Sequence, residues 1–402
     1  MSLVPAIAQQ DEWADDIEIT TDSIDTDTLP TVLQWPRNVQ GRIDQIVQDP
    51  ILDRSQLGLL VWDLTADSAI YRYYDQQLMR PASVMKLVTA ITAIDRLGGD
   101  YHFTTSLYYK GQITDSTLMG DVYVVGGMDP MLDGSDLQTF ARELRQLGID
   151  SISGRLIADV SMKDTLRWGE GWCWDDENPE LSPLTLGRDT HFMERFVQTL
   201  AAEGIATDSI VLTRGMKPSD ALIVCVRRHS LDQVLMKMMK DSDNFYAESV
   251  LYQTAAATGH RPAMASDGMA VTRRLINSLG LNGHNYRLAD GSGLSLYNYV
   301  SPELLVRLLR FAWRNQRVGQ HLLPSLPIAG QDGTLKKRMR RSAAEGNVKA
   351  KTGTLTGISS LAGYCTAANG HELCFAIINQ GIMHSREGKT IQDRICQALC
   401  RL

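Results

Sequence analysis

The chain has 402 residues, of which 44% are apolar and 22% are charged, a composition typical of a globular protein with two or three domains. No run approaches the ~18 apolar residues that a membrane-spanning helix needs, and no basic stripe suits nucleic acid. We therefore expect no nucleic-acid partner and at most peripheral contact with a membrane.

The six cysteines and eight histidines give little support to a disulfide scaffold or a metal site. The cysteines lack Cys-x-x-Cys spacing, and the histidines lack a His-Glu-x-x-His string. We expect no metal and no other cofactor.

The net charge of −7 comes from the first 30 residues, which hold eight acids and no base. The remaining 39 acidic and 40 basic residues nearly balance. Residues 1–30 are therefore predicted to be a flexible acidic arm. The chain opens without a Lys/Arg-led secretory signal, which fits either a cytosolic protein or the mature form of an exported one.

Two short strands are predicted first, at 58–64 and 69–74. Pro81-Ala82 then leads into a predicted helix from Ser83, whose apolar residues recur at helical spacing until Gly98-Gly99 ends it. From residue 101 to about 221 the pattern changes to alternating strand-like segments around one amphipathic helix. We expect residues 101–221 to form a separate α+β domain inserted into the first.

The last part of the chain is predicted to be helical and then rich in strands. The predicted helices are 230–258, with a break at Asp241, then 302–313 and about 386–402, and the predicted strands are 347–355, 358–366 and 372–380. The N-terminal and C-terminal strands should share one antiparallel sheet, so that 31–100 and 222–402 form a discontinuous domain. Asn369-Gly370 predicts a two-residue hairpin turn that would place Cys365 opposite Cys374.

Three short strings carry the candidate chemistry: Ser83-Val-Met-Lys86, Ser242-Asp-Asn244 and Lys351-Thr-Gly353. Ser83 and Lys86 are i and i+3 on a helix, so both side chains lie on one face. Serine needs an adjacent base to act as a nucleophile, and a lysine with a lowered pKa can serve. Each string alone is better explained by ordinary surface residues, but together they predict an acyl-transfer site.

The other two strings offer groups for the substrate. Ser242 could relay a proton to the leaving amine, and Asn244 could hold both the substrate amide and the lysine. The charge of Lys351 and the hydroxyl of Thr352 suit a terminal carboxylate, and Gly353 would let a substrate backbone approach closely.

These strings resemble the low-molecular-mass class C penicillin-binding proteins, the D-alanyl-D-alanine carboxypeptidase/endopeptidase family. The resemblance extends over about residues 40–400. Other family-like strings are Val125-Gly-Gly-Met-Asp-Pro130, Gly171-Trp-Cys-Trp-Asp-Asp176, Asp290-Gly-Ser-Gly-Leu-Ser295, Ser325-Leu-Pro-Ile-Ala-Gly330, Asp332-Gly-Thr-Leu335 and Ala350-Lys-Thr-Gly-Thr-Leu-Thr-Gly357. The 159 residues from Ser83 to Ser242 leave room for an inserted domain, which class A β-lactamases lack.

The resemblance implies an α+β serine β-lactamase/transpeptidase-like domain, with an antiparallel sheet and a helical subdomain, that acts on peptidoglycan stem peptides in the periplasm. Ser83 would attack the penultimate D-Ala carbonyl with Lys86 as base, and β-lactam antibiotics would trap the acyl-enzyme. The N–H groups of Ser83 and Thr354 would form the oxyanion hole. The substrate carboxylate would be held by Lys351, Thr352 and Thr354.

One position departs from the family pattern. Many relatives carry arginine where this chain has Leu296, and that arginine is taken to bind the side-chain carboxylate of a diaminopimelyl residue. Asp176, which matches the family's acidic partner for the side-chain ammonium, is present. Alternative functions are a β-lactamase or esterase of the same superfamily, or a non-catalytic peptidoglycan or β-lactam sensor. The oligomeric state stays open.

Overall fold

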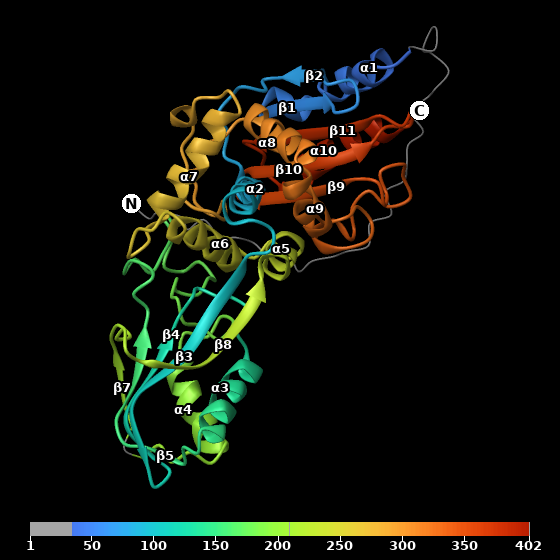
Figure 1. Ribbon diagram of the computed structural model, residues 1–402. Coiled ribbons are helices and arrows are strands. Elements are labelled where there is room, and N and C mark those ends of the chain that lie inside the picture. Colours follow the sequence, from blue (N-terminus) through green and yellow to red (C-terminus); the bar gives the residue numbers. More distant parts are fainter. Residues whose placement is uncertain (1–33, 209, 402) are drawn as a thin grey trace.

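The structure, a computed structural model, describes residues 34–208 and 210–401. The predicted acidic arm at 1–30 lies outside these residues. The described chain forms two β-sheets, one in the upper and one in the lower part of Figure 1. No helix in the described ranges is long and apolar enough to cross a membrane.

The first sheet has five strands in the order β2-β1-β11-β10-β9, and every neighbouring pair is antiparallel. The strands are β1 (Gln56–Asp63), β2 (Ser68–Tyr73), β9 (Lys349–Leu355), β10 (Ile358–Thr366) and β11 (Glu372–Gln380). The prediction that strands from both ends of the chain share one antiparallel sheet is confirmed.

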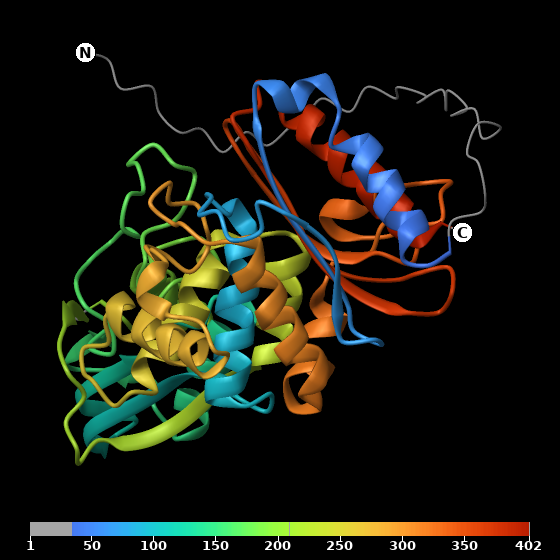
Figure 2. The same ribbon diagram turned by 90° about the horizontal axis from the view of Figure 1, so that it is seen from above.

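Helices cover both faces of this sheet (Figure 2). Helices α1 (Arg37–Ile46) and α10 (Ser385–Cys400) lie on one face, and α2 (Met85–Leu97) and α8 (Pro302–Arg314) lie on the other. Because both faces are covered, β10 and β11 are almost wholly buried, which explains the uninterrupted apolar run at 373–378 in β11.

Helix α2 is the centre of the helical part, and its residues from Met85 to Ile94 are all buried. Apart from Lys86, Thr89 and Thr92, these residues are apolar, as a helix buried on every side requires. Around it lie α5 (Leu231–Lys240), α6 (Asn244–Ala256), α7 (Ala265–Ser278) and α9 (Gln316–Ser325).

The second sheet is mixed, in the order β7-β6-β4-β3-β8, with the short β5 paired to β4. Its strands are β3 (His102–Thr114), β4 (Thr117–Val125), β5 (Ser151–Ile152), β6 (Arg155–Asp159), β7 (Val211–Arg214) and β8 (Leu222–Ser230), and it packs against helices α3 (Gly134–Gln146) and α4 (Phe192–Ala202). Helix α3 begins at a capping box formed by Asp133 and Asp136.

The end predicted for the inserted domain needs correction. Residues 222–230 were assigned to the discontinuous domain, but they form β8, which pairs along its length with β3 in the second sheet. The second sheet therefore extends to Ser230, where α5 starts directly with a Ser230–Gln233 capping box.

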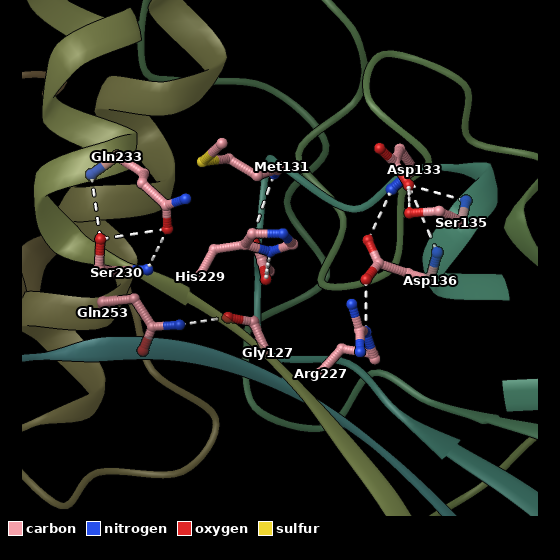
Figure 3. Close-up of polar contacts among 11 residues, drawn as sticks. Gly127, Met131, Asp133, Ser135, Asp136, Arg227, His229, Ser230, Gln233 and Gln253 are labelled. Atoms are coloured by element: carbon pink, nitrogen blue, oxygen red, sulfur yellow. Dashed lines mark hydrogen bonds and ion pairs between the residues drawn. The ribbon is translucent and has the colours of Figure 1, made fainter. Parts of the chain in front are cut away.

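Polar contacts tie the second sheet to the helices of the first domain (Figure 3). Gln253 of α6 donates to the carbonyl oxygen of Gly127, just after β4. Nearby, His229 of β8 lies 2.8 Å from the buried carboxylate of Asp129. The first contact places the segment after β4 against α6, which also carries Asn244, and the second ties that segment to β8.

The predicted pairing of Cys365 with Cys374 is wrong. The hairpin has a three-residue loop, Ala368–Gly370, closed by Ala367 and His371, with Gly370 at φ 84°. One extra loop residue shifts the register, so that Cys365 lies opposite Leu373 and Cys374 opposite Tyr364. The two thiols consequently point to opposite faces of the sheet, and both are free.

Candidate active site

Ser83 lies in a 3₁₀ turn, Ala82–Val84, that leads into the buried helix α2. Ala82 adopts φ 49°, an uncommon value for a residue other than glycine. The prediction that a helix starts at Ser83 thus holds to within one turn. Ser83 is half-buried, with its hydroxyl beside Lys86.

Lys86 is fully buried and its ammonium has three partners. Lys86 Nζ donates to Ser83 Oγ at 3.0 Å, to Asn244 Oδ1 at 2.7 Å and to the main-chain oxygen of Ser292 at 2.8 Å. A fixed amine within hydrogen-bond distance of a serine hydroxyl is the arrangement that activates a nucleophile.

Burial lowers the pKa of Lys86 to about 8. The nearby carboxylates of Asp290, Asp243 and Glu248 act in the opposite direction, because negative charge favours the ammonium form. A lysine with this pKa is partly neutral near pH 8, and only the neutral amine can accept the serine proton.

Ser242 lies at the break between α5 and α6, with φ 63°, and its Oγ accepts a hydrogen bond of 2.8 Å from Lys351 Nζ. The predicted break in the helix is confirmed. Lys351 is fully buried, and burial, with the neighbouring charge of Lys86, lowers its pKa well below the usual value. The carboxylate of Asp243 caps α6, and Arg188 of the inserted domain lies 3.4 Å from it.

Strand β9 lies directly against the serine. A Cβ on Gly353 would lie 2.2 Å from Ser360 Oγ, 2.8 Å from the Pro81 oxygen and 2.9 Å from the Ser83 nitrogen. Glycine is needed here because the protein's own backbone approaches, whereas the sequence suggested the approach of a substrate. Thr352, whose Oγ1 donates to Thr334 Oγ1 at 2.7 Å, and Thr354 alternate with Gly353 and are partly exposed.

The loop from Asp290 to Asn298 completes the surroundings of Lys86, and sequence reasoning gave a role to only one of its residues, Leu296. Asp290 is buried and accepts from Gly293 N, Ser295 N and Trp172 Nε1 at 2.8 to 2.9 Å. Glu248 binds the Gly291 and Ser292 amides of the same loop. The only sequence signal for Glu248 was its place one helical turn after Asn244.

Leu296 and Asp176 contact different groups of residues. Leu296 is half-buried against a small apolar cluster that includes Ala82 and Trp172, and its main-chain oxygen accepts from Arg80 Nε at 3.0 Å. Asp176 accepts from Cys173 N at 2.7 Å, and burial raises its pKa. Trp172 thus brings the loop that carries Asp176 close to Leu296.

The structure brings together Ser83, Lys86, Ser242, Asn244 and Lys351 through side-chain hydrogen bonds, with Gly353 packed against the serine. In the described part of the chain, no group of His, Cys, Asp and Glu side chains is arranged to hold a metal ion.

Comparison with known proteins gives consistent matches. The chain matches the D-Ala-D-Ala carboxypeptidase 3 (S13) family over residues 39–185 and 186–402. It is 28% identical to a D-alanyl-D-alanine carboxypeptidase from Actinomadura sp., over 89% of this chain and 83% of that protein. It is 26% identical to the D-alanyl-D-alanine carboxypeptidase DacB from Haemophilus influenzae, over 85% of this chain and 89% of that protein.

Solved structures match the fold. The structure of penicillin binding protein 4 (dacB) from Haemophilus influenzae superimposes with a TM-score of 0.80 at 24% identity, covering 88% of this chain and 97% of that one. A second structure of that protein, complexed with a β-lactam, gives a TM-score of 0.74. These likenesses support the predicted α+β architecture.

Proposed function

The chain belongs to the D-Ala-D-Ala carboxypeptidase 3 (S13) family and is a serine-type D-Ala-D-Ala carboxypeptidase, and we propose that Ser83 is its acylated nucleophile and Lys86 its general base. One observation carries this assignment. The buried Lys86 places Nζ 3.0 Å from Ser83 Oγ, and its pKa is lowered to about 8.

The proposed reaction begins when the neutral Lys86 accepts the hydroxyl proton of Ser83. The Ser83 oxygen attacks the carbonyl carbon of the penultimate D-Ala, and the charge on the carbonyl oxygen is held by the N–H groups of Ser83 and Thr354. The C–N bond then breaks, and the leaving D-Ala nitrogen takes the proton that Lys86 accepted, passed on through Ser242, so that Lys86 is neutral again. Water hydrolyses the Ser83 ester and releases the shortened peptide.

Substrate binding is assigned to the other strings of the site. Lys351, Thr352 and Thr354 would hold the terminal carboxylate, and Asn244 would hold the substrate amide while it orients Lys86. The contact between Lys351 and Ser242, 2.8 Å, supports a shared role for the cation and the relay hydroxyl. We assign Asp176 and Leu296 to the subsite for the side chain of the third stem-peptide residue.

Peptidoglycan peptides and β-lactams are the proposed partners, and cross-linked peptides are proposed as substrates for an additional DD-endopeptidase activity. Because these substrates lie outside the cytoplasmic membrane, we propose a periplasmic location.

The test is covalent labelling with a fluorescent penicillin, read after denaturation. Wild-type protein should keep the label and Ser83→Ala should lose it, while Ser278→Ala, on α7, should label normally. Labelling of the Ser83 variant would overturn the nucleophile assignment. Rapid turnover of the β-lactam would favour a β-lactamase, and reversible binding alone would favour a sensor.

A further inference from the structure

Glu248 is a buried carboxyl group that the reaction described above does not use. It lies on α6, one helical turn after Asn244, and only 1% of its surface is exposed. A buried carboxyl group is costly unless its oxygens are hydrogen-bonded, so its partners indicate what it does.

Both partners of Glu248 Oε1 are main-chain amides of one loop. The oxygen accepts from Gly291 N at 2.9 Å and from Ser292 N at 2.8 Å. The carbonyl oxygen of the same Ser292 accepts from Lys86 Nζ at 2.8 Å. Two residues of α6 therefore orient Lys86, Asn244 by direct contact and Glu248 through Ser292.

We propose that Glu248 is a positioning residue for the general base: by holding the Gly291–Ser292 backbone it fixes the Ser292 carbonyl, which directs Lys86 toward Ser83. This inference rests on the proposed roles of Ser83 and Lys86.

The packing at this point leaves little freedom. A Cβ on Gly291 would lie 3.0 Å from the Ala247 oxygen, so the loop backbone packs directly on α6. On its other side the Gly291 oxygen accepts from Thr89 Oγ1 of α2 at 2.6 Å. The loop is thus held between the two helices that carry Lys86 and Asn244, and the amides of Gly291 and Ser292 are bound by Glu248.

The electrostatic surroundings couple Glu248 to the base. Burial, followed by the charge of Asp290, raises the pKa of Glu248 to about 8. The titratable groups whose charges interact with Glu248 are Asp290, Lys86, Lys163 and Tyr252, and an ionised Glu248 raises the pKa of Lys86. With this pKa Glu248 is largely protonated below pH 8, so its main support for the Lys86 ammonium is the Ser292 carbonyl that it holds in place. Loss of that carbonyl contact lowers the pKa of Lys86.

The experiment compares Glu248→Ala with Glu248→Gln, which keeps an acceptor oxygen without the charge. The matched control is Thr254→Ala, on the same helix, where a buried hydroxyl bonds only within α6, to the Val250 oxygen. For each variant the acylation rate constant at saturating β-lactam is measured as a function of pH, and hydrogen exchange is measured at the Gly291 and Ser292 amides.

We expect Glu248→Ala to acylate at least about tenfold more slowly. The fall of its acylation rate on the acid side of the pH profile should move to lower pH, and the Gly291 and Ser292 amides should lose their protection from hydrogen exchange. Glu248→Gln should restore the protection and bring the plateau rate to within about threefold of wild type. Glu248→Gln should also bring the acid side of the profile back toward the wild-type pH, because it restores the hold on Ser292, and Thr254→Ala should change none of these readouts. If Glu248 had a purely structural role, Glu248→Ala would lower the fraction of folded, active protein but leave the acid side of the pH profile at the wild-type pH.

Two results would overturn the inference: wild-type rate and protection in Glu248→Ala, or a Gln variant as impaired as the Ala variant. Failure of the proposed function gives a different result. Wild-type protein would then not acylate, while amide exchange would still report whether Glu248 holds the loop.

Discussion

Lys86 and Lys351 are both fully buried, and both bind the same short turn between α5 and α6. Lys86 donates to Asn244 at one end of the turn and Lys351 donates to Ser242 at its other end. Burial lowers the pKa of both lysines, and the charge of Lys86 lowers that of Lys351 further, because like charges disfavour each other.

Acylation should depend on pH through Lys86. Only the neutral amine accepts the Ser83 proton, and the pKa of Lys86 is about 8, so the rate should fall as pH drops below about 8. Lys86→Ala should acylate about a hundredfold more slowly or worse, measured by stopped-flow labelling. Lys110→Ala, which removes a lysine paired with Asp220 on the second sheet, is the control. A Lys86 variant with a near-normal rate would exclude the general-base role.

Lys351 should matter most for substrates with a free terminal carboxylate. Loss of one partner of a buried charge pair costs about 2–5 kcal/mol, so Lys351→Ala should lower kcat/KM strongly for the acid form of a stem peptide. For the same peptide with a C-terminal amide, Lys351→Ala should lower kcat/KM much less. Equal losses for the two peptides would show that Lys351 does not bind the carboxylate.

Gly353→Ala should impair the site through packing. The added methyl group would contact Ser360 Oγ, the Pro81 oxygen and the Ser83 nitrogen, so the serine turn has to move. We expect a stability loss of about 1–3 kcal/mol in urea and loss of penicillin labelling. Gly134→Ala, where a Cβ would meet nothing within 4 Å, should leave both unchanged. Normal labelling of the Gly353 variant would contradict the close packing of β9 on Ser83.

Asp176 should select substrates with a free amine on the third stem-peptide residue. Loss of a buried ionic partner costs about 2–5 kcal/mol, so acetylated peptides should be cleaved much more slowly than free amines. Leu296 cannot bind a carboxylate, so amidation of the neighbouring carboxylate should matter little. The measurement is kcat/KM for the four peptides that combine the two modifications.

The matched controls for this experiment are Asp176→Asn, which should abolish the amine preference, and Asp175→Asn, which should retain it. Equal rates with and without the amine would remove Asp176 from the site. A large penalty for amidation would point to another cation, and Arg80, bonded to the Leu296 carbonyl, is the first to replace by alanine.

The parts of the structure that the sequence predicted are those governed by local pattern and by motif spacing. The strand pairs at both ends of the chain, the buried helix after Ser83 and the break at Ser242 follow from periodicity and turn residues. The convergence of Ser83, Ser242 and Lys351 followed from the three strings taken together.

The errors have a different physical origin, because they depend on pairing and burial that no local pattern encodes. One extra residue in the Ala368–Gly370 loop put Cys365 and Cys374 on opposite faces of the sheet. Strand β8 was placed in the wrong sheet because its partner, β3, lies more than a hundred residues earlier in the chain. The role of Glu248 depends on a loop brought to it only by the tertiary fold.

The pairing of β1 with β11 also governs when the enzyme can become active. Gln56 and Gln380 bond to each other although they are 324 residues apart in the sequence. The sheet against which the serine turn packs therefore closes only after nearly the whole chain has been synthesised, and contacts of such long range form slowly. A truncated or still-emerging chain would contain Ser83 and Lys86 without strand β9 beside them, so the nucleophile would be assembled only in the finished protein.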